Sequence, residues 1–112
     1  MEITFASTRV RRQCESERVL QRAHGQACAR KLMARLADLD AAASLSEMRT
    51  LPGRCHELSG DRAGQLALEL ADGKRLVIEP ANVPLPVDQG GGLDWARIDA
   101  VRILEIANYH RG

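Results

Sequence analysis

The sequence predicts an α+β fold in which two helices pack on one face of a mostly antiparallel sheet, in the order β-α-α-β-β-β-β. Three observations carry this prediction. Two apolar runs, 66–70 and 76–78, flank Asp72-Gly73, which is a strong hairpin signal. Residues 26–39 repeat apolar side chains at helical spacing. Residues 100–110 are dense in β-branched and aliphatic side chains, which favours a central strand.

The length of the hairpin loop decides which side chains share a face. A two-residue loop would place Leu70 opposite Arg75 and mix polar with apolar side chains on both faces. A three-residue loop with Gly73 left-handed places Glu69 opposite Arg75 instead. It gathers five apolar side chains on one face: Leu66, Leu68, Leu70, Leu76 and Ile78. We therefore predict the second register, with an apolar face for helices. The other face has smaller and partly charged side chains and is open to other contacts. Its residues are Ala67, Glu69, Arg75 and Val77.

Upstream of the hairpin, the elements follow from local signals. The alternation in residues 2–5 predicts a short first strand. Ser7 or Thr8 can cap one helix that enters at Arg9 and ends at the His24-Gly25 break. A second helix runs from Gln26 to about Leu39, with its stripe at Ala29, Leu32, Met33, Leu36 and Leu39. A turn at 45–48 and a short strand near 54–58 then lead into the hairpin.

Downstream of the hairpin, prolines and glycines mark a long irregular connection of about 80–97. Gly90-Gly91-Gly92 has neither the strand-loop-helix setting nor the Lys-Ser/Thr of a phosphate loop, so it is interpreted as a flexible linker. Trp95 is expected to be a packing plug beneath this connection rather than a platform for stacking a base. The last strand, 100–110, then closes the sheet.

Length and composition limit the class of protein. A length of 112 residues predicts a single domain spanning 1–112. Aromatics make up only 3%, so the core must be aliphatic. No stretch is long and apolar enough for a membrane span or a signal peptide, so we expect a cytoplasmic protein without membrane contact. Cys14, Cys28 and Cys55 are odd in number and widely spaced, which suits buried thiols in a reducing compartment.

Charge is unevenly spread along the chain. Residues 9–35 hold eight Arg or Lys and two Glu, a balance of +6. The whole chain carries +1, so the remainder sums to −5. Such asymmetry points to an anionic partner for the first third, either nucleic acid or an acidic protein surface. A solvated helix face explains it equally well, and the sequence leaves both explanations open.

Candidate chemistry lies on the polar sheet face and at the chain end. His24, His56 and His110 form no recognisable ligand spacing, so we expect no metal and no other cofactor. His56 with Arg54, Arg62 and Arg75 could bind a phosphodiester, although a strand histidine is often a structural hydrogen-bonding group. Tyr109-His110 would place an imidazole capable of acid–base chemistry at the open edge of the sheet, unless it is only a surface tail.

Several stretches in order along 29–110 resemble the HigB-like plasmid-maintenance killer proteins of the RelE toxin superfamily. They are Ala29-Arg-Lys-Leu, Leu39-Asp-Ala-Ala, Arg49-Thr-Leu-Pro-Gly, Leu58-Ser-Gly-Asp-Arg-Ala-Gly-Gln, Lys74-Arg-Leu and Val101-Arg-Ile-Leu-Glu-Ile-Ala-Asn-Tyr-His. The Gly-Asp-Arg-x-Gly-Gln core with the terminal Tyr-His makes the resemblance fairly specific. It implies a RelE-like, microbial-RNase-like fold. It also implies mRNA cleavage on the bacterial ribosome and neutralisation by a helix-turn-helix antitoxin.

The resemblance also implies roles for particular residues. Arg62 and Arg75 fall where the family holds phosphate-binding or structural arginines. Tyr109 and His110 fit the catalytic terminal pair, and His56 fits a histidine that some members use.

Other positions depart from the family pattern. Ser59 stands where some members have a basic residue, and Asn108 stands where an acidic residue is usual. Lys74 replaces a tryptophan, and Glu69 replaces an arginine. The 80–97 connection is also longer than usual. Glu69 matters most for RNA binding, because it replaces a cation with an anion beside Arg75.

Two functions therefore remain in view. The first is a toxin-type, metal-independent endoribonuclease in which Arg62 and Arg75 clamp the RNA backbone and His110 transfers a proton. The second is a catalytically weakened relative that keeps antitoxin binding. Tyr109-His110 and Arg75 favour the first, whereas Ser59, Glu69 and Asn108 favour the second.

Overall fold

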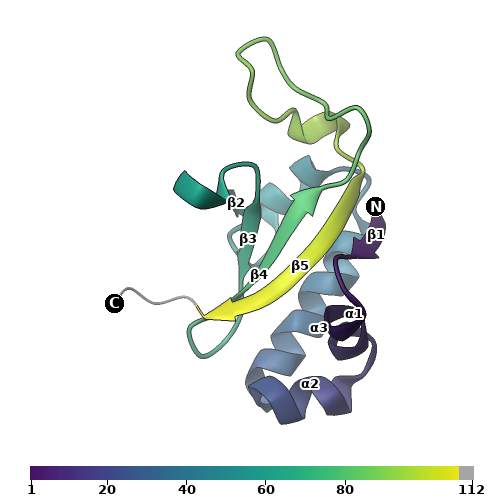
Figure 1. Ribbon diagram of the computed structural model, residues 1–112, viewed down its shortest axis with the longest axis vertical. Coiled ribbons are helices and arrows are strands. Elements are labelled where there is room, and N and C mark those ends of the chain that lie inside the picture. The colour runs from purple at the N-terminus through teal and green to yellow at the C-terminus, as the bar shows by residue number, and fades with distance from the viewer. Residues whose placement is uncertain (109–112) are drawn as a thin grey trace.

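A computed structural model describes residues 1–108, which form three α-helices and a five-stranded sheet (Figure 1). The strands are β1 (Glu2–Phe5), β2 (His56–Glu57), β3 (Leu66–Glu69), β4 (Lys74–Pro80) and β5 (Ala100–Asn108). The helices are α1 (Thr8–Glu15), α2 (Glu17–His24) and α3 (Gln26–Ala41). Three short 3₁₀ helices complete the set: η1 (Leu45–Thr50), η2 (Gly60–Arg62) and η3 (Trp95–Arg97). The α+β prediction is confirmed.

The sheet has the strand order β1-β5-β4-β3-β2 and is antiparallel except for the parallel pair β1–β5. The hairpin adopts the predicted register, with Glu69 opposite Arg75 and Leu68 opposite Leu76. Leu70 donates its backbone N–H to the carbonyl of Lys74 at 2.9 Å, which closes the three-residue loop. β5 is central for its first half, because β1 pairs with residues 100–103.

The first helical stretch is divided, where the sequence predicted one helix. Ser16 ends α1 and begins α2, and its hydroxyl accepts the backbone N–H of Val19 at 3.2 Å. A serine in this position competes with helix continuation by satisfying the first free N–H of a new helix. The N-cap of α1 is Ser7, whose hydroxyl accepts from Val10 at 3.2 Å. The prediction of two helices in total was therefore wrong, because residues 1–108 contain three.

The core lies between the helices and the apolar face of the sheet. Figure 1 shows α3 running behind the strands. The same buried cluster contains Leu32 and Leu39 from α3 and the predicted hairpin residues Leu66, Leu68, Leu76 and Ile78. Met33 and Leu36 are only partly buried. The polar face differs from its prediction, because Ala67 and Val77 are fully buried.

Arg35 is the one buried charged residue among those described, although it lies in the middle of an amphipathic helix. Its Nε donates to the carbonyl of Glu69 at 3.1 Å, which ties α3 to the end of β3. Gly53 packs directly against it: a Cβ atom built at Gly53 would lie 2.6 Å from Arg35 Nε. Gly53 also has a φ of +111°, a conformation that other residues rarely adopt.

Gly53→Ala is therefore expected to lower the free energy of unfolding by about 2–4 kcal/mol, through backbone strain and the clash with Arg35. Urea denaturation of the full chain measures this. Gly64→Ala is the matched control, because Gly64 also has a positive φ but nothing within 4 Å of the added Cβ. Equal costs for the two variants would show that Arg35 does not confine Gly53.

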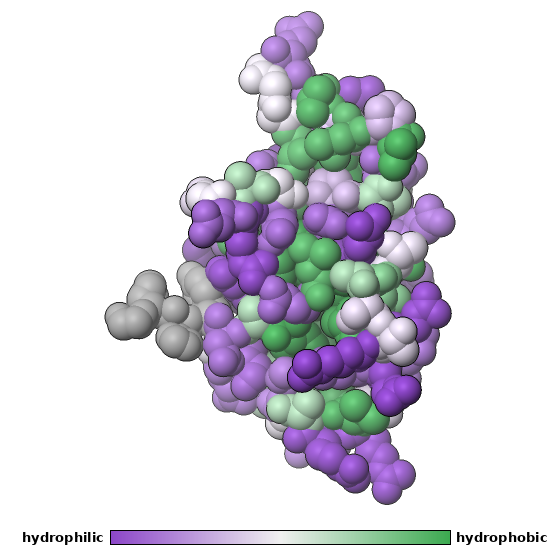
Figure 2. All heavy atoms as spheres, viewed as in Figure 1, coloured by the Kyte–Doolittle hydropathy of each residue, from purple (hydrophilic) through white to green (hydrophobic). Residues whose placement is uncertain are grey.

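Residues 81–99 connect β4 to β5 as a protruding loop, as the sequence predicted for about 80–97 (Figure 1). The glycine run is not a linker. The Asp88 carboxylate accepts the N–H groups of Gly90 and Gly92 at 2.9 and 3.0 Å, and this closes a tight turn. Figure 2 shows apolar side chains gathered on this loop, where three are exposed: Val83, Leu85 and Val87.

Trp95 is the packing plug that was predicted. It is buried beneath the loop and donates its indole N–H to Glu57 at 2.8 Å. The Arg49 guanidinium stacks 3.8 Å from its ring centroid. The ring face is therefore occupied and does not serve as a platform for a base. No helix among residues 1–108 is long and apolar enough to cross a membrane.

Candidate nucleic-acid interface

The polar face of the sheet brings together the four predicted site residues that the structure describes. Strand pairing aligns His56, Ala67, Val77 and Glu105 in one row across β2, β3, β4 and β5. A second row aligns Glu69, Arg75 and Ala107. Because alternate residues of a strand point to the same face, His56 and Arg75 project from the same side of the sheet. Arg54, which precedes β2, and Arg62, at the end of η2, reach carboxylates on that side.

Arg62 lies across the middle of this face. Its guanidinium donates to Gln65 Oε1 at 2.7 Å and forms an ion pair with Glu105 Oε2 at 2.5 Å. Gln65 immediately precedes β3 and Glu105 is on β5, so the side chain spans the intervening strand β4. This position accounts for the burial of Val77, which pairs with Glu105 in the sheet.

Arg54 and His56 occupy the β2 edge. Arg54 has a φ of +51°, unusual for a residue with a Cβ, and its largely exposed side chain pairs with Glu69 at 3.3 Å. His56 Nδ1 lies 2.7 Å from the carbonyl of Arg54. A carbonyl only accepts, so Nδ1 carries the proton. In the neutral form of this exposed imidazole, Nε2 is then the acceptor.

Arg75 is half-buried and stands between Glu69 on β3 and Ala107 on β5. The predicted register for Glu69 and Arg75 is therefore confirmed, and Glu69 also makes an ion pair with Arg54. Tyr109 and His110 lie outside the described residues. Asn108, which precedes them, ends β5 and pairs with Lys74, close to Arg75 along the neighbouring strand.

Sequence reasoning missed Glu105. This carboxylate is separated from Arg62 by 43 positions, and an irregularity in the pairing of β4 with β5 shifts the register beyond Val77. Simple alternation of side chains along β5 therefore does not predict on which face of the sheet Glu105 lies. Glu79 and Arg102 lie on the same face and form an ion pair at 3.1 Å. Within the described part of the chain this face therefore carries four arginines and three carboxylates.

The other side chains with catalytic potential have different surroundings. Burial raises the pKa of Cys14 to about 11 and that of Cys55 to about 12, so both are protonated thiols at neutral pH and weak nucleophiles. Burial also raises the pKa of Cys28. Within residues 1–108 no group of three His, Cys, Asp or Glu side chains could hold a metal ion. The polar face is thus suited to bind an anion and to move a proton at an imidazole.

Comparison with known proteins agrees with this architecture. No protein-family profile and no curated protein sequence matches the chain. Among solved structures, it is similar to a chain of the YoeB-YefM complex from Staphylococcus aureus, with 16% sequence identity and a TM-score of 0.55. The match covers 99% of this chain and 98% of that one. The chain therefore has a RelE/YoeB-like fold, with N-terminal helices packed on a five-stranded, mostly antiparallel sheet.

Proposed function

We propose that this chain is the toxin of a type II toxin–antitoxin system and cleaves mRNA on the ribosome as a metal-independent endoribonuclease. The observation that carries the proposal is the match, over nearly the whole of both chains, to a structure from the YoeB-YefM complex. The resemblance of the sequence motifs to HigB-like killer proteins supports placing the chain in that group of RelE-type toxins. In this proposal it acts in the cytoplasm as a single domain of residues 1–112, and a helix-turn-helix antitoxin neutralises it.

The chemistry requires only groups that this chain and RNA supply. RNA carries its own nucleophile, the 2′-hydroxyl, so no metal and no covalent intermediate is needed. Arg62 and Arg75 would hold the scissile phosphodiester through charge-assisted hydrogen bonds. Arg54 and the exposed imidazole of His56 would extend this contact along the RNA backbone. His110 would transfer the proton, with Tyr109 positioning the reacting groups.

A second function rests on a specific observation. Arg62 pairs with Glu105, Arg54 with Glu69 and Arg102 with Glu79, so carboxylates engage these three cations of the face. A chain in this state would bind its antitoxin while cleaving RNA poorly. The alternative is thus a catalytically weakened relative that acts as an antitoxin-binding interaction protein.

Induced expression followed by primer extension on cellular mRNA separates the two functions. Under the nuclease proposal, the intact chain produces new 5′ ends within translated regions. His110→Ala then reduces them about a hundredfold or more, the usual range for loss of a general acid or base. Arg75→Ala should also reduce cleavage. Arg18→Ala, which removes the same charge from an exposed position on α2, should not.

Unchanged cleavage in His110→Ala would contradict the assigned proton transfer. If the intact chain produces no new ends but copurifies with a small helix-turn-helix protein, the interaction function is favoured instead.

A further inference from the structure

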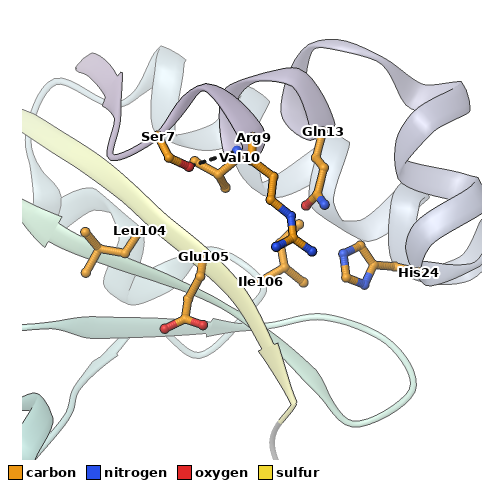
Figure 3. A pocket seen from close by; sticks show the side chains of 8 residues that line it. All are labelled: Ser7, Arg9, Val10, Gln13, His24, Leu104, Glu105 and Ile106. Atoms are coloured by element: carbon orange, nitrogen blue, oxygen red, sulfur yellow. Dashed lines mark hydrogen bonds between the residues drawn. The ribbon is translucent and has the colours of Figure 1, made fainter.

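A cavity of about 280 Å³ lies between the helices and β5. Figure 3 shows Arg9 and Gln13 extending from α1 toward His24 at the end of α2. The opposite wall is formed by three consecutive residues of β5, 104–106. None of these helical residues has a role in the nuclease proposed above.

The β5 wall is the backbone edge of the strand. Ile106 packs with the core on the helical side of the sheet, whereas Glu105 pairs with Arg62 on the polar side. A cavity that touches both residues must therefore lie at the strand's edge. β4 occupies one edge, since Leu76 pairs with Ile106 and Val77 with Glu105. The cavity consequently lies at the other edge.

That edge is covered by a strand only in part. β1 runs parallel to β5 at residues 100–103, and its pairing ends where Ala6 donates to the carbonyl of Ile103 at 2.9 Å. The chain then turns at Ser7 into α1. Within the described part of the chain, no strand pairs with residues 104–108 on this side. A strand edge of five residues extends about 17 Å and offers backbone donors and acceptors to another extended chain.

The side chains around this edge favour a negatively charged group on a bound ligand. Neither ring nitrogen of His24 has a hydrogen-bond partner among the described residues, although both atoms are shielded from solvent. Burial lowers the pKa of His24, and the charges of Lys74 and Arg9 lower it further. The imidazole is therefore neutral at pH 7 and presents one donor and one acceptor. Arg9 and Lys74 add two positive charges, while Glu105 is already engaged by Arg62.

We propose that the edge of β5 at residues 104–108 binds an extended peptide segment of a partner protein, which adds to the sheet as a strand in line with β1 and places a carboxylate side chain against Arg9 and His24. Main-chain hydrogen bonds provide the affinity in this mode, and pockets for alternate side chains provide the selectivity. Val10 and Ile106 supply the apolar part of the pocket. This site goes beyond the nuclease function and does not rest on it.

The test is a selection from a displayed library of random decapeptides against the full chain, with counter-selection against Arg9→Glu. Selected sequences are expected to carry an acidic residue and no proline at their centre. The best one, made synthetically, should slow hydrogen exchange at the amides of 104–108. Its affinity should fall about tenfold or more in Arg9→Glu, because a charge-assisted contact is lost. Arg18→Glu, an equal charge change on an exposed part of α2, should have little effect.

Backbone methylation of that peptide distinguishes strand addition from simple charge attraction. Only alternate amides of an added strand face the sheet. N-methylation in one alternating frame should therefore abolish binding, and methylation in the other frame should leave it intact. The proposal would be overturned if methylation in the two frames had equal effects. It would also be overturned if the peptide protected other amides from exchange, or if the selection gave no enrichment over the counter-selection. Protection of 104–108 in the absence of peptide, in a dimer, would also overturn it and assign this edge to a second copy of the chain.

Discussion

Replacing Glu69 and Glu105 together by glutamine is expected to raise ribosome-dependent mRNA cleavage about tenfold or more. Each carboxylate engages a cation of the proposed RNA-binding face, Arg54 at 3.3 Å and Arg62 at 2.5 Å. A released arginine can contact a phosphate instead, and a hydrogen bond to a charged group contributes about 1.5–3 kcal/mol. The change also makes the face more positive by two charges, which favours RNA at low salt.

The same double substitution should leave stability nearly unchanged. Both ion pairs are partly exposed, and pairs of this kind contribute about 0–1 kcal/mol. Arg62 also keeps its hydrogen bond to Gln65, so its position across β4 is retained. A primer-extension assay on stalled ribosomes measures the activity, and urea denaturation measures the stability.

The matched control is Glu15→Gln with Glu17→Gln, which removes two negative charges from exposed positions on the helices. Its cleavage rate should stay close to that of the parent. Lower cleavage in the Glu69/Glu105 variant would show that these carboxylates assist the reaction rather than oppose it. No cleavage by either protein would favour the antitoxin-binding function.

Leu32→Asp is expected to lower the free energy of unfolding by about 4 kcal/mol or more, enough to unfold many domains of this size. Leu32 is fully buried in the cluster that joins α3 to the apolar face of the hairpin. Aspartate would lose this packing and bury an unpaired charge. Thermal and urea unfolding followed by circular dichroism measure the effect.

Ala34→Asp introduces the same side chain at an exposed position of the same helix and should cost about 1 kcal/mol or less. The difference between the unfolding free energies of the two variants separates the cost of burying the aspartate from its cost in helix propensity. A Leu32→Asp protein that melts within a degree or two of the parent would contradict the assignment of α3 as the cover of the leucine face.

The hairpin register and the position of α3, which were predicted from local pattern, were confirmed. The hairpin register follows from the period-two alternation of Leu66, Leu68 and Leu70, since a slip of one residue would expose all three. The position of α3 follows from the apolar spacing of Leu32 and Leu39. The division at Ser16 could also have been predicted, because a serine followed by a glutamate is a typical start of a helix.

Predictions that depended on contacts between side chains far apart in the sequence were incomplete. The sequence placed Arg62, Arg75, His56 and Arg54 on or near one sheet face, and the structure brings them together there. The sequence placed Glu69 opposite Arg75, but it did not indicate the ion pairs of Glu69 with Arg54 and of Glu105 with Arg62. Tyr109 and His110 lie outside the described residues, so their catalytic roles stay predictions.

The sequence by itself determined the hairpin, the helix that covers it and the face on which Arg75 lies, because each depends on periodicity within a few neighbouring residues. Only the tertiary structure decided that Arg62 pairs with Glu105, that Arg35 is buried against Gly53, and that His24 lines a cavity at the edge of β5. Side chains distant in sequence approach one another only after the chain has packed, and pairing irregularities such as the one beyond Val77 then set the face on which each one lies.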